Sequence, residues 1–329
     1  MNKGRTAWRR LLPLISGIGF LVSVVMIVLL IGDFRELRNA WYDLNWQYAV
    51  WLAPLAVVNH AIRYWRWEIL LKYVSPASFK RSSAIILFCA GSLLIFTPGR
   101  AGEVAKSVYA REFFGIPVSK SLPVLVAERL SDLLVMALLA GLGLFLIGAA
   151  PSLVVAGIIV LIILTMFVLR TSVPARLAEW KPLSFVKNSG VGEFLSQANT
   201  AQSSLLTVSG FTPNFALGVG AWMVEVTIFF ISLSAFGNGP DFGLFSLALA
   251  SFPLASLAGS LSFLPGGLGV TEGGLVTMGV FLGGLPKETT VLAALSARLA
   301  ISGVIILAGL VSLVFLRRMH HALASRDRQ

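Results

Sequence analysis

The 329-residue chain is poor in the residues from which most enzyme and metal sites are built. Its single cysteine, Cys89, can form neither an internal disulfide nor a cysteine-based metal cluster. The three histidines belong to no motif such as HExxH, and no GxSxG nucleophile motif occurs. Only 12% of the residues are charged, about half the share in a typical soluble domain. We therefore expect no enzymatic activity, no cofactor and no metal site.

The chain is rich instead in long apolar runs, and 57% of its residues are hydrophobic. The run Leu11–Ile31 exceeds, and Leu153–Leu169 approaches, the length of about 20 residues that crosses a bilayer as a helix. Composition and run length together predict an all-α, polytopic membrane protein. The apolar segments lie at residues 11–31, 46–71, 82–97, 121–149, 152–170, 213–236, 242–264 and 289–316.

The basic residues are concentrated where a membrane protein faces the cytoplasm. The formal net charge is +11, but Lys and Arg cluster at the termini and in short loops, which does not favour nucleic-acid binding. Positively charged loops stay inside, which places both termini and the loop at 171–212 in the cytoplasm. We interpret Leu11–Ile31 as a retained first span, because no small-residue cleavage site follows it.

A weak internal repeat places two interrupted apolar segments in corresponding positions. Residues 96–130 recur in register at residues 263–299, and each copy contains a Pro/Gly break followed by a glutamate. The breaks are Pro98-Gly99 and Pro265-Gly266-Gly267. Proline ends an incoming half-helix, and glycine permits the turn into an outgoing one. Duplicated broken helices of this kind are typical of the binding site between the two repeats of a transporter.

Counting membrane crossings along the chain predicts two hairpins that enter from opposite faces. If residues 82–114 and 242–284 are re-entrant hairpins, about six full spans remain and the two repeats have inverted orientations. The alternative, in which both hairpins are full spans, stays open because loop charges exclude it only weakly. The chain would form a single domain over residues 1–329. Its parts are repeat one at about 46–149, a cytoplasmic linker at about 171–212 and repeat two at about 213–316.

Several charged residues lie inside the apolar segments, where each costs at least about 2.5–3.5 kcal/mol and therefore needs a partner or a function. Arg100, beside the first break, can bind a phosphate head group together with free amides at the half-helix ends, or can form a salt bridge with Glu103. Arg298 has no acid nearby on its own helix, so another helix or a ligand must supply its partner. The predicted substrate-binding residues are Arg63, Gly99, Arg100, Arg129, Gly266, Gly267 and Arg298.

The acids inside the apolar segments are expected to balance charge or to move protons. Glu103 and Glu272 hold equivalent positions in the two repeats, and each can interact with a helix dipole or carry a proton. Asp132 follows Arg129 by three residues, a spacing that permits an ion pair on one helix face. Glu225 has no charged neighbour within a turn, so it is either protonated or paired between helices. The predicted charge-balancing or proton-relay residues are Glu103, Glu128, Asp132, Glu225 and Glu272.

The second apolar segment combines several polar residues on one face. Asn59, Arg63 and Arg66 follow one another at positions i, i+4 and i+7. Arg66 and Glu68 lie toward the cytoplasmic end, where we expect their side chains to snorkel to the interface, whereas Arg63 lies deeper. His60 is expected to be a hydrogen-bonded interior residue.

Three motifs resemble those of one known family. They are a PGRxGE segment at Pro98–Glu103, an ERxxD pattern at Glu128–Asp132 and an LPGGLGxxE segment at Leu264–Glu272. Together with Arg63–Leu71, they make the chain similar to the lysylphosphatidylglycerol synthase transmembrane, or flippase-like, family over about residues 10–318. The soluble aminoacyltransferase domain of the best-known relatives is not expected here, so aminoacylation of phosphatidylglycerol is not carried over.

The resemblance implies a protein of the bacterial inner membrane that moves a lipid or a lipid-linked sugar between leaflets. The expected route is a midplane site between the two repeats, and the expected head group is anionic. A small-solute or ion-coupled transporter and a non-transporting subunit of a lipid-modifying system are the alternatives. Membrane lipids or lipid-linked sugars are the expected partners, nucleic acid is not, and a homo-oligomer or an associated lipid-modifying enzyme stays open.

Overall fold

The computed structural model describes residue 42 and residues 44–76, 78–97, 102–149, 157, 190–237 and 239–326, with side chains for all except 190, 191 and 321–326. Within these ranges every regular element is a helix, as the sequence predicts. The predicted spans at 11–31 and 152–170 lie outside the described residues, apart from residue 157. The helices are α3 (Trp46–Ala49), α4 (Leu52–Val74), α5 (Arg81–Ser92), η1 (Leu93–Phe96), α6 (Ala105–Phe114), α7 (Val118–Leu146), α10 (Gly190–Leu205), α11 (Val208–Phe236), α12 (Phe242–Leu261), η4 (Pro265–Gly267), α13 (Val270–Phe281) and α14 (Lys287–Arg326).

Four of the described helices are long and apolar enough to cross a membrane, namely Val118–Leu146, Val208–Phe236, Phe242–Leu261 and Lys287–His320. Helix α4 has 23 residues and is therefore about 35 Å long, which also suffices to cross a bilayer core. It is less apolar than the others because it carries several charged side chains. The prediction of an all-helical, multi-pass membrane protein is confirmed.

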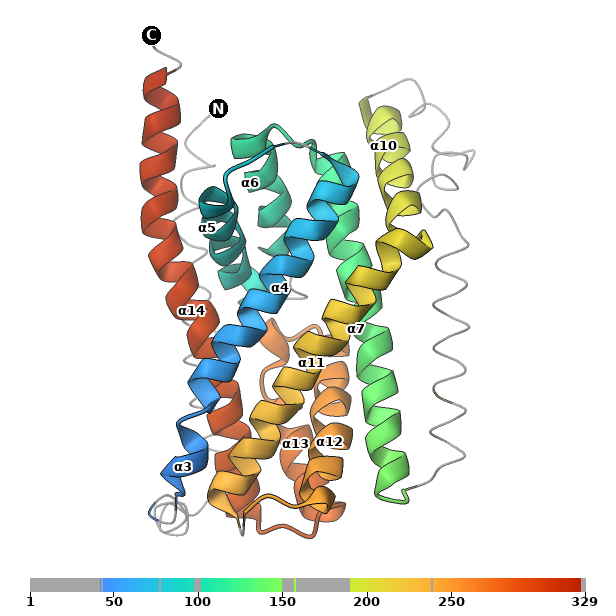
Figure 1. The fold of residues 1–329 in the computed structure, drawn as a ribbon, viewed down its shortest axis with the longest axis vertical. Helices are drawn as coiled ribbons and strands as arrows, with labels where there is room; N and C mark the ends of the chain where they lie inside the picture. Colours follow the sequence, from blue (N-terminus) through green and yellow to red (C-terminus); the bar gives the residue numbers. More distant parts are fainter. Residues whose placement is uncertain are drawn as a thin grey trace.

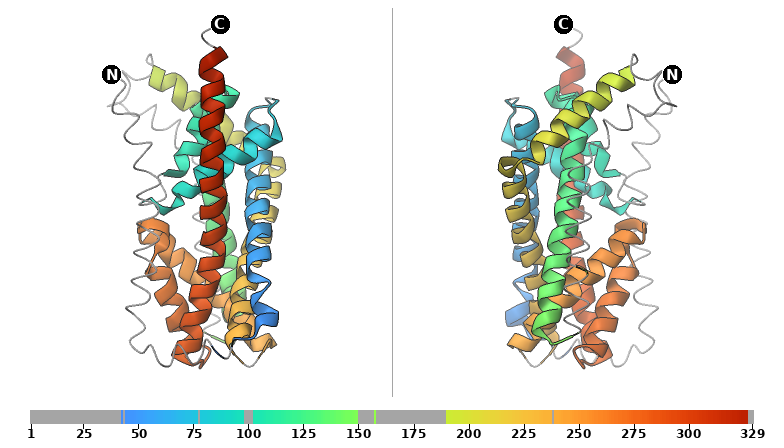
Figure 2. Two further views of the ribbon diagram at one scale, coloured as in Figure 1. Left: turned by 90° about the vertical axis from the view of Figure 1, so that its left-hand side faces the viewer. Right: turned by 90° about the vertical axis from the view of Figure 1, so that its right-hand side faces the viewer.

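Four long helices run along most of the molecule, and two shorter helical hairpins lie beside them (Figure 1). The long helices are α4, α7, α11 and α14. One hairpin consists of α5, η1 and α6, and the other of α12, η4 and α13. The hairpins occupy opposite halves of the bundle, and their tips meet where η1 contacts η4 (Figure 2). The duplicated broken segments of the sequence are thus two hairpins that approach each other from opposite ends.

The described end of the predicted linker at 171–212 packs on the bundle. Helix α10 lies along the first part of α7, where the hydroxyl of Ser119 donates a hydrogen bond to the side-chain oxygen of Gln197. Helix α10, the α5–α6 hairpin and the C-terminal part of α14 all lie at the same end of the bundle (Figure 1). Which side of the membrane this end faces stays a prediction from the loop charges.

The tip of the second hairpin shows how its Pro/Gly break ends one helix and begins the next. After α12 the chain forms a single 3₁₀ turn at Pro265–Gly267. Gly266 and Gly267 have φ angles of 62° and 69°, which residues with a side chain rarely adopt. The backbone N–H of Gly269 then donates a hydrogen bond of 2.7 Å to Glu272, which caps the start of α13. The sequence therefore specifies this tip locally.

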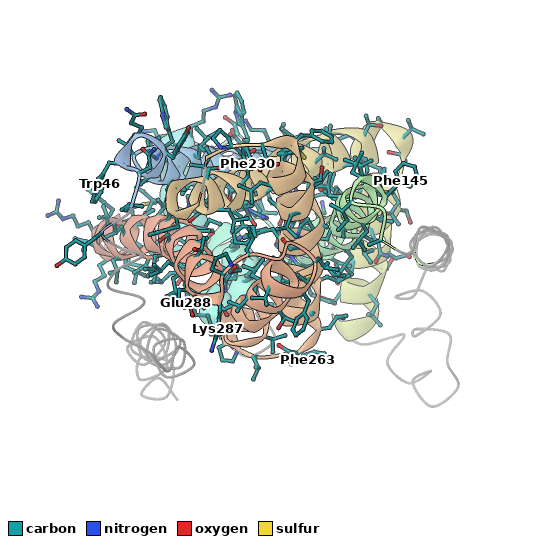
Figure 3. The ribbon with its side chains drawn as sticks, turned by 90° about the horizontal axis from the view of Figure 1, so that it is seen from below. Trp46, Phe145, Phe230, Phe263, Lys287 and Glu288 are labelled. Carbon is teal, nitrogen blue, oxygen red and sulfur yellow. The ribbon has the colours of Figure 1, made fainter. Side chains whose placement is uncertain are left out.

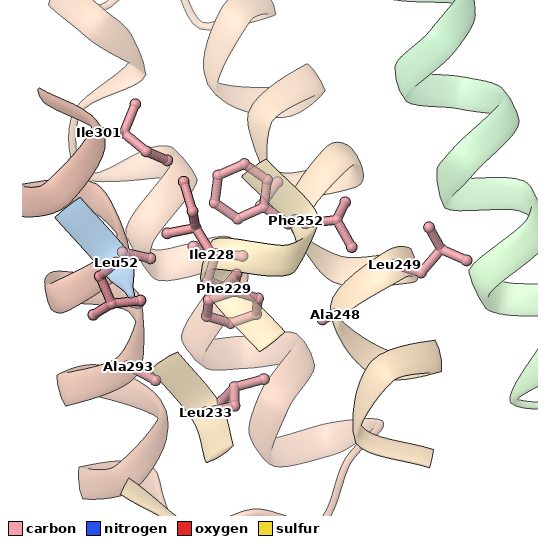
Figure 4. Packing of buried hydrophobic residues seen from close by; sticks show 14 of the residues in the cluster. Leu52, Ile228, Phe229, Leu233, Ala248, Leu249, Phe252, Ala293 and Ile301 are labelled. Carbon is pink, nitrogen blue, oxygen red and sulfur yellow. The ribbon is translucent and has the colours of Figure 1, made fainter. Parts of the chain in front are cut away.

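The main apolar core lies between α4, α11, α12 and α14. Phe229 and Ile228 of α11 pack with Phe252 of α12, while Leu52 and Ile301 approach from α4 and α14 (Figure 4). Lipid tails are as apolar as these side chains, so close packing, and not transfer from water, stabilises such a core inside a membrane. The core holds the hairpin of the second repeat against the long helices.

Helices α7 and α12 cross at a point where only a glycine fits. A Cβ atom on Gly143 would overlap the backbone nitrogen of Ala250. Replacing Gly143 by leucine is therefore expected to lower the free energy of unfolding by about 1–3 kcal/mol, measured by reversible denaturation in mixed micelles. Gly220→Leu on α11 is the matched control, because a Cβ there meets no atom within 4 Å. Equal losses in the two variants would contradict this view of the α7–α12 contact.

Candidate functional site

A cavity of about 80 Å³, lined in part by charged side chains, lies where the two hairpin tips meet. Its walls come from α4, α5, α6, α7, α11, α12, α13 and α14 and from both 3₁₀ turns. The tips touch closely, because a Cβ atom on Gly266 would lie only 3.0 Å from Cδ1 of Phe96. Both repeats predicted from the sequence therefore contribute residues to one site.

Among the described residues, the charged side chains that line this cavity or contact its lining balance one another. The positive members are Arg63, Arg66, Lys106, Arg129 and Arg298. The negative members are Glu103, Glu128, Asp132, Glu225 and Glu272. With all ten ionised, the formal charges of this group, the charged cluster, sum to zero. Pairing of this kind is what makes charged side chains tolerable inside a membrane protein.

Asp132 of α7 connects three arginines. Its Oδ1 accepts hydrogen bonds from Nη1 of Arg66 at 2.7 Å and from Nε1 of Trp222 at 3.2 Å. Its Oδ2 lies 3.4 Å from Nη2 of Arg129 and 3.7 Å from Nη1 of Arg63. Arg66 and Asp132 are almost completely buried, with 1% and 2% of their surfaces exposed. Charge-assisted hydrogen bonds away from bulk water therefore join α4 to α7.

The burial of Arg66 corrects the expectation that this side chain snorkels to the interface. Its Nη2 donates a hydrogen bond of 2.8 Å to the backbone carbonyl of Glu128, and its Nε lies 3.7 Å from the Glu128 carboxylate. The prediction was wrong because the packing of α4 on α7 brings acceptors to Arg66, so that it need not reach water. Glu68 is also buried, although its carboxylate meets Lys72 at 2.5 Å and Arg81 at 3.4 Å near the end of α4.

Arg63 contacts groups from α4, α7 and α11. Its Nη2 donates a hydrogen bond of 2.6 Å to Glu225 on α11, and its Nε donates one of 3.2 Å to Asn59. The guanidinium carbon lies 5.4 Å from the centre of the Trp222 ring, within the range of a cation–π contact. Glu225 thus has an interhelical partner, which was one of the two alternatives for this residue.

Arg129 is held more loosely than the other arginines of the charged cluster. Its Nη2 lies 3.5 Å from Glu103 and 3.4 Å from Asp132, longer than the charge-assisted hydrogen bonds of about 2.7–2.9 Å. Its buried Nε has no hydrogen-bond partner within the described part of the chain. Its side chain is 31% exposed, against 20% or less for the other three arginines. Arg129 therefore retains the most capacity to bind a ligand.

The two repeats place matching Glu–Arg pairs at the cavity. In repeat two, Nε of Arg298 donates a hydrogen bond of 2.7 Å to Glu272, and Nη2 donates one of 2.8 Å to the carbonyl of Gly266. In repeat one, Arg129 lies 3.5 Å from Glu103. In both pairs the arginine follows the glutamate by 26 residues. Arg298 thus has a partner on another helix, which was one of the two alternatives for this residue.

The predicted site residues that the structure describes come together at this cavity. Gly266 and Gly267 line it. Of the predicted arginines, Arg63, Arg129 and Arg298 belong to the charged cluster. Gly99 and Arg100 lie outside the described residues, so their predicted roles stay predictions. His60 also lines the cavity, where its Nε2 lies 3.4 Å from Sγ of Cys89, in agreement with an interior position.

Two residues of the site were missed by sequence reasoning. The ammonium of Lys106 lies 3.9 Å from Glu103 and 4.4 Å from the centre of the Phe88 ring. Lys106 follows Glu103 by three residues, a spacing that permits an ion pair on one helix face and could have identified Lys106 from the sequence. Trp222 donates a hydrogen bond to Asp132, but the two residues are 90 positions apart, so no local pattern links them.

Replacing Glu272 by glutamine is expected to lower the free energy of unfolding by about 1.5–3 kcal/mol, because Arg298 loses its charged acceptor. The side-chain oxygen of glutamine can still accept the hydrogen bond from Gly269 that caps α13. Reversible denaturation in mixed micelles measures the loss, with Glu193→Gln on the exposed face of α10 as the isosteric control. A change no larger than that of the control would show that this pair contributes little.

Comparison with known proteins identifies the family. Residues 16–309 match the family described as the lysylphosphatidylglycerol synthase TM region. The chain belongs to this family. The match to the lysylphosphatidylglycerol synthase TM region spans both hairpins and every residue that lines the charged cavity. No curated protein matches the chain. Family membership and the long apolar helices together establish a multi-pass membrane protein.

Proposed function

We propose that this protein moves a lipid or a lipid-linked head group between the leaflets of the bacterial inner membrane. The observation that carries the proposal is the charged cluster at the meeting point of two opposed hairpins, in a bundle of long apolar helices. Charged side chains buried among membrane-spanning helices are unfavourable and are found mainly where a polar group must pass. Sites between broken-helix repeats are where transporters hold their substrates.

In the proposed arrangement the two hairpins are re-entrant, and the repeats that contain them have inverted orientations. Backbone that leaves the helical geometry at membrane depth must be satisfied by protein or by water, and not by lipid. The carbonyl of Gly266 fits this requirement because it accepts a hydrogen bond of 2.8 Å from Arg298. With the positive-inside bias, α10 and both termini would face the cytoplasm.

Arg129 is the proposed first ligand of an anionic head group. Phosphate oxygens would replace the contacts of 3.5 and 3.4 Å that hold its guanidinium against Glu103 and Asp132. Glu103 would then keep a positive neighbour in Lys106, which lies 3.9 Å away. Arg298 offers the equivalent guanidinium from the second repeat, so that a head group can be passed between two similar sites.

The neutral balance of the charged cluster limits what can bind. An anion alone would leave the described site with an excess of negative charge in a medium of low dielectric constant, which is unfavourable. We therefore propose that either a proton on Glu103 or Glu272, or a positive group within the head group itself, accompanies the phosphate. This assigns the acids of the two repeats a charge-balancing role.

Leaflet exchange in proteoliposomes tests this function. The vesicles contain phospholipid labelled on its head group in both leaflets, and a membrane-impermeant reductant destroys the outer label. Loss of the protected inner label that is faster than in protein-free vesicles is the expected result. No acceleration with any anionic or zwitterionic head group would contradict the proposal, and protein-dependent uptake of a small solute would support the alternative transporter.

A further inference from the structure

A groove of about 200 Å³ opens between α7 and the tip of the second hairpin. It lies beside the charged cavity, and the two share part of their lining. The shared residues are Arg129, Trp222, Gly259, Ser260 and Gly267. The groove is therefore separated from the charged cavity by no more than these shared side chains, and it lies between a long helix and a hairpin.

The lining of the groove changes from charged to apolar along its length. Arg129 and Asp132 lie at the end next to the charged cavity. The other end is apolar and belongs to two neighbouring turns of α7 and to the hairpin tip. Its residues are Leu133, Met136, Leu261, Phe263 and Leu264. A surface that combines a charged inner end with an apolar outer end matches a molecule with a polar head and an apolar tail.

The apolar side chains at the hairpin tip point outward. Leu261, Phe263 and Leu264 are 63%, 74% and 46% exposed. Phe263 has a φ of 56°, and it is the one non-glycine residue with positive φ in the described part of the chain. A bulky residue is held in this strained conformation only when the surrounding structure requires it. In Figure 3 Phe263 lies at the outer rim of the bundle, where it borders the groove.

We propose that this groove holds an acyl chain of the lipid whose head group occupies the charged cavity. The inference rests on the proposed function, and it names the part of the substrate that distinguishes a lipid from a free phosphate compound. A tail that moves from the bilayer into the groove exchanges one apolar surrounding for another, so its transfer is close to neutral. The tail can then stay in apolar contact while the head group enters the charged cavity.

Photocrosslinking tests the proposal at a position that bulk lipid does not reach. Met136 lines the groove but is only 2% exposed, so a benzophenone amino acid there captures lipid only if lipid enters the groove. The neighbouring Val135 is fully buried in the core and does not line the groove, which makes it the matched control. The protein is reconstituted in vesicles of phosphatidylethanolamine, phosphatidylglycerol and cardiolipin, and adducts are identified by mass spectrometry. Lipid adducts at Met136 and none at Val135 are expected.

A second crosslinking position tests the proposal even if the Met136 variant does not fold. Leu264 lines the groove and Leu282 lies away from it, and the two are similarly exposed at 46% and 44%. With the crosslinker at Leu264, Arg129→Ala should reduce the lipid adduct several-fold, whereas the adduct at Leu282 should not change. Equal adducts at both positions, insensitive to Arg129, would overturn the proposal, as would a folded Met136 variant without any lipid adduct.

Leaflet exchange separates this inference from the proposed function. Met136→Trp should fill the groove and slow exchange at least several-fold, while Leu282→Trp, at an exposed position away from the groove, should retain it. Wild-type exchange that persists unchanged in Met136→Trp would overturn the groove assignment and leave the proposed function intact. Lipid adducts at Met136 in a protein without exchange would support the groove as a lipid site and contradict the transport function.

Discussion

Replacing Asp132 by asparagine is expected to lower the free energy of unfolding by about 3–5 kcal/mol, the largest loss among the variants considered. The carboxylate accepts hydrogen bonds from Arg66 at 2.7 Å and from Trp222 at 3.2 Å, and it also faces Arg63 and Arg129. Asparagine has nearly the same shape but carries no charge. The buried guanidinium of Arg66 would then keep only the more distant carboxylate of Glu128 as a charged partner.

Reversible denaturation in mixed micelles measures this loss, and a double variant identifies its cause. Arg66→Met combined with Asp132→Asn removes the buried pair and should recover a large part of the stability. Glu193→Gln, which removes an exposed carboxylate on α10, should change the free energy by at most about 0.5 kcal/mol. If Asp132→Asn and the double variant are equally unstable, the contact between Arg66 and Asp132 is not the cause.

Replacing Arg129 by alanine is expected to slow leaflet exchange by a factor of about 10 to 150, which corresponds to the loss of about 1.5–3 kcal/mol of binding to a charged group. Its present contacts to Glu103 and Asp132 are long, at 3.5 and 3.4 Å, so the fold should lose little. Asp132 keeps Arg66, and Glu103 keeps Lys106. Arg129→Ala is therefore expected to slow leaflet exchange while the free energy of unfolding changes little.

Two further variants sharpen this test. Arg129→Lys keeps the charge but not the planar set of donors, and should restore exchange only in part. Arg111→Ala removes an exposed arginine of α6 and should leave exchange as in the wild type. Full exchange in a folded Arg129→Ala variant would exclude Arg129 as the head-group ligand. A parallel loss of stability and exchange would instead assign it a structural role.

Local sequence patterns were sufficient to predict the hairpins. The Pro/Gly break before Glu272 specifies its turn through two glycines of positive φ and a capping glutamate, all within a few residues. The repeat between residues 96–130 and 263–299 placed Glu103 and Arg129 in register with Glu272 and Arg298. The local break thus predicted where a helix ends, and the repeat predicted which charged residues are equivalent.

The remaining errors concern contacts between distant segments. Arg66 was assigned to the interface from its place along α4, whereas its partner Asp132 lies 66 residues later on α7. Which faces of α4 and α7 meet depends on tertiary packing. The spacing of residues along one helix does not predict it. The same holds for Trp222 and for the groove at Met136, because both arise only when separate helices come together.

A structure of the wild-type protein in lipid nanodiscs, determined by electron cryomicroscopy, tests the central claim most directly. We predict density for a lipid whose head group contacts the guanidinium of Arg129 and whose tail lies between α7 and the tip of the α12–α13 hairpin. A well-resolved map in which side chains close the groove, while the charged cavity opens to water on one face, would contradict a lipid route. That result would favour a small-solute transporter.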